Sequence, residues 1–124
     1  EVWAEPGRYI CGNAVNVISS IICKQMRYEK QCFYIDDGIY GSFSGILFDH
    51  WDYDIISLKD EDNTYEKATI AGPSCDSLDI VKKEMYCPKL DEGDLLIALN
   101  AGAYSKVSAT TFNGFSLPKT VALE

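Results

Sequence analysis

Short segments rich in apolar and β-branched residues recur about every ten residues along this chain, and glycine, proline, aspartate or asparagine follows most of them. Such punctuation is typical of tight turns between strands. The spacing therefore predicts a mainly β fold, either a sandwich or a barrel. The expected strands are 31–35, 55–59, 65–71, 95–99, 103–111 and 119–123, with the remnant of another over 1–4.

Several stretches do not fit a simple strand. Arg8 to about Ala14 follows Pro6-Gly7 and predicts a short helix, because proline is well placed at a helix start. Asn16–Arg27 fits both a strand period and a helical stripe, and its isoleucine and valine content favours a strand. Ile39–Phe48 predicts a loop and short helix near a site, and Asp60–Asn63 predicts an acidic, solvated turn.

The charge balance excludes several classes of function. The 124 residues include 11 basic and 19 acidic side chains, a formal net charge of −8. Nucleic acids and anionic membranes bind basic faces, so neither is an expected partner. The sequence contains no run of 18 apolar residues that would span a bilayer. With 47% apolar residues, the chain is long enough for one folded domain and too short for two.

The cysteines indicate a reducing compartment. There are five of them, an odd number, and no two form a Cys-x-x-Cys pair. The single histidine, His50, adds no set of ligands for a structural zinc ion, so we expect no metal. Free thiols are typical of the cytoplasm, which is the expected location.

The chain opens in mid-element. It begins at Glu1 without an initiator methionine, and Val2–Ala4 resembles the end of a strand. No basic segment followed by an apolar stretch, as in a signal peptide, is visible there. We therefore expect a fragment of a larger protein.

Two short motifs place reactive groups at turns. Glu5-Pro6-Gly7-Arg8 puts a guanidinium beside the free N–H groups of a helix start, which suits a phosphate; the alternative is a plain turn with a surface ion pair. Gly72–Asp76 presents Cys75 and Asp76 in a tight loop. A neighbouring carboxylate favours the protonated thiol, which suits a proton donor rather than a nucleophile. The alternative is an inert cysteine beside a turn-forming aspartate.

The remaining candidates are weaker when taken alone. Asp49 follows an apolar stretch and is placed to point a carboxylate into a pocket, whereas His50 fits a structural or surface role. The clusters Gly102-Ala103-Tyr104 and Phe112-Asn113-Gly114-Phe115 combine aromatic residues with glycine. By themselves such clusters are typical of core and turns.

In their order and spacing, these motifs resemble those of eukaryotic-type ornithine decarboxylases over nearly the whole chain. Diaminopimelate and biosynthetic arginine decarboxylases share the Glu-Pro-Gly-Arg and Gly-Ala-Tyr pieces. Diaminopimelate decarboxylases, however, usually have Cys-Glu where this chain has Cys75-Asp76. The segments that carry the resemblance are 5–9, 37–43, 48–50, 72–79, 93–94, 102–104 and 111–115.

The resemblance implies a two-domain enzyme that uses pyridoxal 5′-phosphate, with an N-terminal (β/α)8 barrel and a C-terminal β-sandwich or barrel domain. Residues 1–15 would then be the end of the cofactor-binding barrel, its last strand and helix start, and residues 16–124 the C-terminal β domain. In the family the lysine that binds the cofactor lies upstream, and active sites form between the two subunits of a homodimer. The chain alone is therefore expected to be inactive.

The same resemblance implies roles for three cofactor-binding residues. Glu5 would pair with the pyridine nitrogen and keep it protonated, which makes the ring an electron sink. Arg8 and Tyr104 would hold the cofactor phosphate. No lysine of this chain sits in a motif that matches the family's cofactor-binding lysine.

Five further residues would form the substrate site. Asp49 and Asp76 would bind the distal ammonium of a diamino acid, because carboxylates suit a cation. Tyr40 would line that pocket from across the subunit interface, and Phe112 would line the pocket or the interface. Cys75 would protonate the α-carbon after CO2 leaves, which makes the product an amine rather than an aldehyde.

The implied activity is the conversion of L-ornithine to putrescine, in polyamine biosynthesis. Lysine or another basic amino acid is an alternative substrate, because ornithine and lysine both end in an ammonium. A different class of function is a catalytically silent regulator like the antizyme inhibitors of this family, with antizyme as a relevant partner. Those proteins tend to lose cofactor-contacting residues, which this chain retains. A stand-alone β-domain binding module fits less well, because the chain opens in mid-strand.

Overall fold

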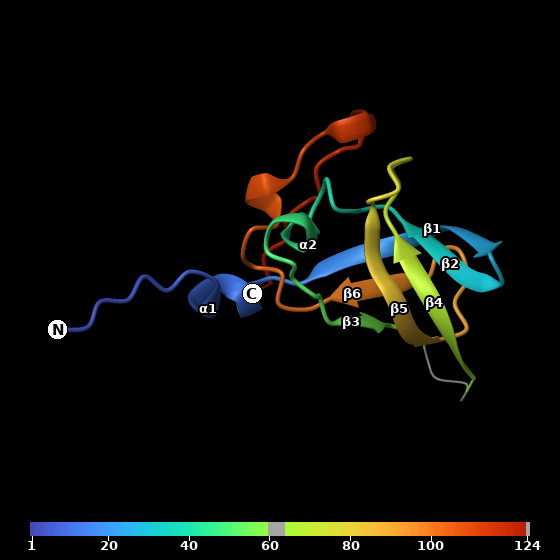
Figure 1. Cartoon of the computed structure of the whole chain (residues 1–124), viewed down its shortest axis with the longest axis horizontal. Coiled ribbons are helices and arrows are strands. Elements are labelled where there is room, and N and C mark those ends of the chain that lie inside the picture. Colours follow the sequence, from blue (N-terminus) through green and yellow to red (C-terminus); the bar gives the residue numbers. More distant parts are fainter. Residues whose placement is uncertain (60–63, 124) are drawn as a thin grey trace.

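The structure is a computed structural model that describes residues 1–59 and 64–123. Within these residues six strands form one sheet in the order β3-β6-β1-β2-β4-β5. The two edge strands, β3 and β5, contact each other, so the sheet curls into a nearly closed barrel (Figure 1). The mainly β class is confirmed. The strands are β1 (Val17–Arg27), β2 (Lys30–Ile35), β3 (Ile55–Ser57), β4 (Tyr65–Ala71), β5 (Ile80–Pro88) and β6 (Leu95–Ala98).

The helical elements are all short. In the described residues they are α1 (Arg8–Cys11), α2 (Gly45–Phe48) and the 3-10 turns η1 (Gly12–Ala14), η2 (Lys106–Ser108) and η3 (Phe112–Gly114). None of these helices is long and apolar enough to cross a membrane. Of these elements only α2 lies between two strands; α1 and η1 precede β1, and η2 and η3 follow β6.

One strand pair sets the topology. β1 and β2 form an antiparallel hairpin, whereas β2 and β4 run parallel, with Gln31 opposite Ala68 and Tyr34 opposite Ala71. A tight turn cannot join parallel neighbours, so the chain from β2 to β4 makes a long crossover. That crossover contains α2 and β3.

The core lies inside the curled sheet. Phe43 and Tyr53, both from the crossover, pack edge to face with ring centres 5.2 Å apart. Burial raises the pKa of the Cys87 thiol to about 11, so this cysteine is an uncharged filler of the core. The buried cluster comprises Ile21, Phe33, Ile35, Phe43, Tyr53, Ala68, Ile70, Val81, Met85, Cys87, Leu90, Leu96, Ala98 and Ala101.

A bulge in β1 changes which side chains point inward. Ser19 and Ile21 are buried, but the register with β2 shifts between Ile21 and Cys23. Beyond the shift Cys23 is exposed and Lys24 is half-buried. An extra residue at a β-bulge reverses the inward face of the strand, which brings the Lys24 stem against the barrel.

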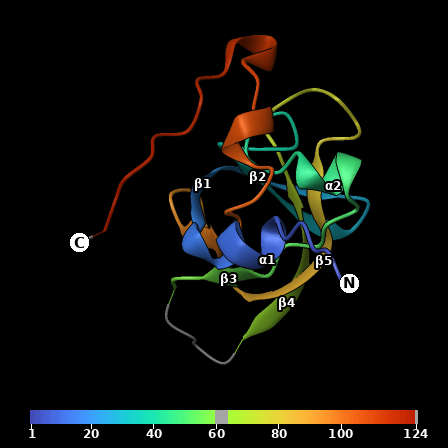
Figure 2. The same cartoon turned by 90° about the vertical axis from the view of Figure 1, so that its left-hand side faces the viewer.

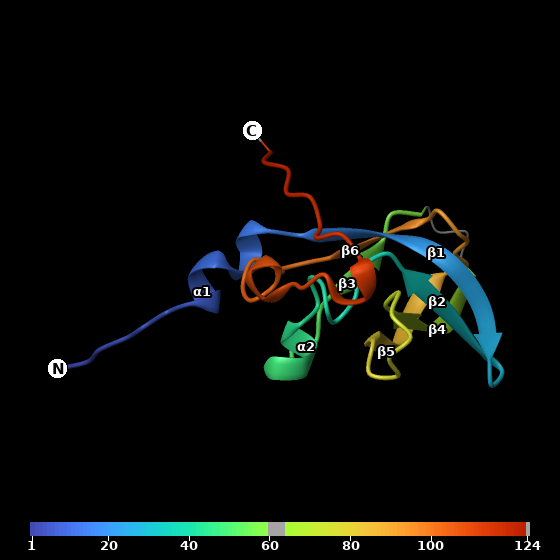
Figure 3. The ribbon, with the colours of Figure 1, turned by 90° about the horizontal axis from the view of Figure 1, so that it is seen from above.

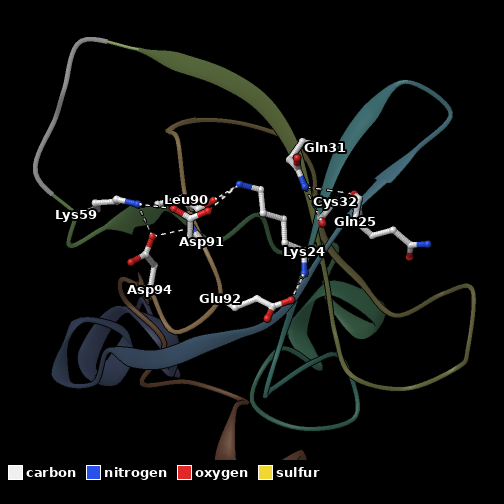
Figure 4. A network of polar contacts seen from close by, with 9 residues as sticks. All are labelled: Lys24, Gln25, Gln31, Cys32, Lys59, Leu90, Asp91, Glu92 and Asp94. Carbon is white, nitrogen blue, oxygen red and sulfur yellow. Dashed lines mark hydrogen bonds and ion pairs between the residues drawn. The ribbon is translucent and has the colours of Figure 1, made fainter.

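Lys24 joins a network of charges at one end of the sheet, which we call the lysine–aspartate network (Lys24, Lys59, Asp91 and Asp94). Lys24 Nζ donates to the Leu90 carbonyl at 2.7 Å and to Asp91 Oδ1 at 2.9 Å. Lys59 Nζ reaches Asp91 at 3.2 Å and Asp94 at 2.9 Å, so the two lysines approach Asp91 from opposite sides (Figure 4). Hydrogen bonds from Lys24, then Lys59, lower the pKa of Asp91. The network ties the start of β6 to β1 and to the end of β3.

Most expected elements are confirmed. The helix expected from Arg8 to about Ala14 is α1 followed by η1, and Asn16–Arg27 contains β1. The loop and short helix expected over Ile39–Phe48 contain α2. The expected strand Ile55–Lys59 is shorter, ending at Ser57. The acidic turn expected over 60–63 lies outside the described residues.

The expected strand over 103–111 is wrong. The segment forms turns and η2 instead, and Tyr104 has a φ of 53°. Ser105 Oγ donates to the Ala101 carbonyl at 2.6 Å, and Ser108 Oγ donates to that of Tyr104 at 2.9 Å. Local hydroxyl bonds of this kind satisfy the backbone without a sheet partner.

The two terminal strand predictions are also wrong. Residues 1–4 and 119–123 belong to no strand in the described part of the chain. Both segments extend away from the barrel (Figures 2 and 3). Their apolar side chains are exposed, with Val2 at 96% and Leu123 at 95%. Alternating apolar residues alone therefore did not make a strand, because neither segment lies along a sheet edge.

Candidate functional site

The predicted site residues fall into two groups, and Glu5 stands apart. The first, which we call the arginine cluster, consists of Arg8, Asp49, Trp51 and Tyr104. The second, which we call the cysteine cluster, consists of Tyr40, Cys75, Asp76, Phe112 and Asn113. Glu5 is exposed in the N-terminal segment, and its role stays a prediction.

A close backbone approach builds the arginine cluster. The Gly102 amide donates to the Gly12 carbonyl at 2.8 Å. A Cβ at Gly102 would lie 1.8 Å from the Cys11 carbonyl oxygen, so only glycine allows this contact. The next residue but one, Tyr104, adopts a left-handed φ of 53° and places its ring 5.5 Å from the Arg8 guanidinium carbon.

Arg8 is held on two sides. Its Nη2 donates to Asp49 Oδ2 at 2.7 Å, and its guanidinium carbon lies 4.0 Å from the centre of the Trp51 ring. Such stacking fixes the plane of the fork. Trp51 was not a candidate in the sequence, and no motif pointed to it; only the fold brings it to Arg8.

The other terminal nitrogen of Arg8, Nη1, is suited to bind an anion. Nη1 is buried and has no hydrogen-bond partner among the described residues. A buried, charged donor without a partner is costly, and a phosphate oxygen is its best complement. The arrangement of Arg8 and Tyr104 therefore fits the phosphate of pyridoxal 5′-phosphate.

In the cysteine cluster a tyrosine and a carboxylate are paired. The Tyr40 hydroxyl donates to Asp76 Oδ2, and the Leu78 amide donates to Asp76 Oδ1 at 2.9 Å. The Leu78 amide, then the Tyr40 hydroxyl, lower the pKa of Asp76. The hydrogen bond to Asp76 also raises the pKa of Tyr40, so Tyr40 stays the donor and Asp76 the anion.

The segment around η3 lies against the same groups. The Phe112 ring lies 4.3 Å from that of Tyr40, measured between centres. Asn113 Nδ2 lies 3.9 Å from Cys75 Sγ and donates to it, and Cys75 is exposed. Asn113 has a φ of 56°, a left-handed conformation that asparagine tolerates. Asn113 belongs to the Phe112–Phe115 motif, but nothing in that motif indicates a contact with the thiol.

Asp79 joins the loops that carry Tyr40 and Cys75. This buried carboxylate accepts hydrogen bonds from the Ile39 amide at 2.9 Å and from the Ser74 amide and hydroxyl at 3.0 and 2.6 Å. A Cβ at Gly72 would lie 2.1 Å from Asp79 Oδ1. The two loops are therefore fixed relative to each other by Asp79, a residue for which the motifs predict no role.

The carboxylates around the cysteine cluster lack cationic partners. In the described part of the chain no lysine or arginine lies within 4.0 Å of them, and they accept hydrogen bonds from amides and hydroxyls. Those of Asp36, Asp37 and Asp79 line a hollow of about 30 Å³ together with Tyr40 and Phe112. The charge available there suits a cationic ligand. The carboxylates are those of Asp36, Asp37, Asp76 and Asp79.

The two predicted ammonium-binding carboxylates have different neighbours. Asp49 pairs with Arg8, and Asp76 pairs with Tyr40. Among the described residues, no hydrogen bond, ion pair or ring contact joins the arginine cluster directly to the cysteine cluster. Their joint role at one ammonium stays a prediction.

Comparison with known proteins identifies the class to which this fold and site belong. The family model described as the pyridoxal-dependent decarboxylase C-terminal sheet domain matches residues 8–102. The chain belongs to this family. The predicted family relationship and the pyridoxal cofactor of the class are thereby confirmed.

Several relatives are ornithine or lysine/ornithine decarboxylases. The chain is 43% identical to the Selenomonas ruminantium lysine/ornithine decarboxylase over 99% of this chain and 31% of the relative. It is 35% identical to Mus musculus ornithine decarboxylase over 93% of this chain and 28% of the relative. A crystal structure of Vibrio vulnificus lysine/ornithine decarboxylase complexed with cadaverine matches with a TM-score of 0.91 and 41% identity, over 96% of this chain and 32% of that one. The chain thus spans about a third of the length of these relatives.

Proposed function

We propose that the protein to which this chain belongs decarboxylates a basic amino acid with pyridoxal 5′-phosphate, and that its substrate is L-ornithine, which gives putrescine and CO2. The observation that carries the proposal is the cysteine cluster, where Asp76 is held by neutral donors beside a thiol. Such a carboxylate keeps its charge for a ligand. The ornithine and lysine/ornithine decarboxylases among the relatives support the same reaction.

Bound pyridoxal phosphate would supply an electron sink for bond breaking at the α-carbon. Arg8 would hold the phosphate with its unpartnered Nη1, with Tyr104 beside it, and Glu5 would face the ring nitrogen. Asp76 would bind the distal ammonium, with Tyr40 fixing the direction of the carboxylate. Binding at that end orients the α-carbon for the reaction.

A homodimer with shared sites is part of the proposal. Arg8 and Cys75 lie in different clusters of the chain. A site that takes the arginine cluster from one subunit and the cysteine cluster from its partner would use both. The proposed location is the cytoplasm.

Lysine is the second candidate substrate. Solved structures of the Vibrio vulnificus relative hold cadaverine in one case and putrescine in another. The domain division at residues 15 and 16, the silent regulator and the partner antizyme stay predictions.

Steady-state assays on the full-length protein test the proposal. Release of CO2 from ornithine, lysine and arginine would be compared, with amine products identified by chromatography. We expect the largest kcat/KM for ornithine, lysine next, and no turnover without pyridoxal phosphate. Activity on none of the three, with cofactor bound, would favour the silent regulator.

Cys75→Ala tests the proposed proton donor. If the thiol delivers a proton to the α-carbon, its loss slows turnover and directs part of the flux to an aminoaldehyde, with conversion of the cofactor to pyridoxamine phosphate. The measurement is the ratio of putrescine to aldehyde. Cys23→Ala, which removes another exposed thiol, is the control. An unchanged ratio in Cys75→Ala would leave Cys75 without this role.

The isolated 124-residue chain is expected to be inactive. It should form no stoichiometric adduct with pyridoxal phosphate at a single lysine after borohydride reduction. Peptide mass mapping would detect such an adduct, and its presence would contradict the expectation.

A further inference from the structure

The contacts of Asp49 and Arg8 are unequal. Arg8 is held by stacking on Trp51 and its side chain is 21% exposed, whereas the Asp49 side chain is 41% exposed. Among the described residues the Asp49 carboxylate makes no hydrogen bond other than the one to Arg8. The guanidinium is therefore the fixed member of the pair, and the carboxylate is the member that can leave.

The same guanidinium has two donor sites with different occupants. Nη2 donates a hydrogen bond to Asp49 Oδ2 at 2.7 Å, and Nη1 is buried without a partner in the described part of the chain. Both nitrogens belong to one planar group, so an anion on Nη1 comes within a few ångströms of the Asp49 carboxylate. Two anions at that separation repel each other, and the repulsion is larger away from bulk water.

We propose that Asp49 is a built-in counter-anion of Arg8, which opposes phosphate binding and is released toward the substrate when the cofactor phosphate binds. The inference rests on the proposed function and adds a coupling between its two ligands. A cation bound to Asp49 removes the repulsion, so a diamine should strengthen cofactor binding. By linkage, the cofactor should strengthen diamine binding by the same factor.

Asp49→Asn isolates the charge. Asparagine keeps an oxygen that accepts from Arg8 but removes the negative charge. In the full-length protein we expect pyridoxal phosphate to bind about three- to tenfold more tightly than in the wild type, and inorganic phosphate likewise, with a smaller difference in 1 M salt. A purely structural role for Asp49 predicts the opposite sign or no change. Equal or weaker binding by the Asn variant would overturn the proposal.

Two further variants control for position. Asp49→Ala removes the charge and the acceptor together, and because Trp51 still holds the guanidinium, its affinity for pyridoxal phosphate should also rise above that of the wild type. Asp52→Asn removes a neighbouring charge that pairs with Lys82 rather than Arg8, and it should leave cofactor affinity within about twofold of the wild type. A gain in Asp52→Asn as large as that in Asp49→Asn would indicate a general charge effect and would overturn the specific pairing.

The coupling is tested without turnover. Titration of inorganic phosphate, which does not condense with an amine as the aldehyde of pyridoxal phosphate does, should give a several-fold lower dissociation constant in the wild type when putrescine is saturating, and no change in Asp49→Asn. A putrescine effect that persists in the variant would overturn the coupling. A full-length wild type that binds no pyridoxal phosphate would instead contradict the proposed function, and the inorganic phosphate titration would then still test the Arg8 pairing.

Discussion

Two regions of this small barrel each contain several aspartates, and the aspartates of the two regions face different hydrogen-bond donors. In the lysine–aspartate network, Asp91 and Asp94 face Lys24 and Lys59 at 2.9 to 3.2 Å. Around the cysteine cluster, Asp76 and the neighbouring aspartates accept hydrogen bonds from amides and hydroxyls. Both sets are anchored, but only the first is neutralised.

The difference separates two uses of one side chain. An ion pair at a strand end holds neighbouring strands together and leaves little charge for a ligand. A carboxylate held by neutral donors is oriented just as firmly and remains an anion. The type of hydrogen-bond donor, rather than the number of acidic residues, therefore marks the region suited to a cationic substrate.

The largest expected effect comes from exchanging charge for amide in each region. In the full-length protein, Asp76→Asn should lower kcat/KM for ornithine by about ten- to a hundredfold, because it removes the anion that would face the ammonium of the proposed substrate. Asp91→Asn, the matched change in the network, should leave kcat/KM within about twofold. Steady-state kinetics on both variants tests this expectation. Equal losses of kcat/KM in the two variants would contradict the proposed difference between the regions.

A pair of glycines extends the comparison to the backbone. Gly102→Ala should destabilise by about 1–3 kcal/mol and weaken cofactor binding, because the new methyl group meets the Cys11 carbonyl and displaces Tyr104. Gly93→Ala, at a φ of +91° in the network turn, should cost about 1 kcal/mol and leave cofactor affinity unchanged. Denaturant titrations and cofactor dissociation constants test both variants. Normal cofactor binding by Gly102→Ala would contradict the first expectation.

Within the network, Lys24→Met should lower the free energy of unfolding by up to about 1 kcal/mol, because the lysine is only partly exposed and also bonds the Leu90 carbonyl. The loss should shrink in high salt. Urea titrations at low and high ionic strength provide the measurement. A stability loss that salt does not reduce would point to packing of the lysine stem instead.

The smallest effect is a pH dependence in the network. Hydrogen bonds from Lys24, then Lys59, lower the pKa of Asp91 in the folded protein. The Asp91 carboxylate therefore stabilises the fold at pH values above the ordinary pKa of aspartate, and this stabilisation is lost as the pH falls through the lowered pKa. Wild type and Asp91→Asn should therefore differ in stability at pH 6 and converge toward pH 3. Chemical denaturation across that range tests this. A constant difference would mean that the charge of Asp91 is not involved.

The sequence predicted most strands where alternation and turn residues agree, as in β2 and β4. It missed β5 because bulges break the period: Ala68 pairs with Met85 and Ile70 with Lys82, so two steps along β4 match three along β5. Charged residues also interrupt this strand. Strand alternation at 103–111 was misleading because serine hydroxyls satisfied the backbone locally.

For the site, motifs were sufficient where chemistry is local in sequence, as in the loop of Cys75 and Asp76. They could not reveal that Arg8 meets Asp49 and Trp51, more than 40 positions away, because that contact depends on the path of the crossover. They also gave Asp79 no role, since its function is to bind two loops to each other.

The parallel pairing of β2 with β4 has a consequence for the order of folding. The β1–β2 hairpin needs only local contacts and can form early, but the crossover must close a long loop before β4 gains its partner. Tyr40 and Asp49 lie within that crossover. The crossover takes its final path only once β4 has paired with β2, so we expect a nascent or partly folded chain to form neither the arginine cluster nor the cysteine cluster. Ligand binding at these clusters is therefore expected only in molecules whose sheet is complete.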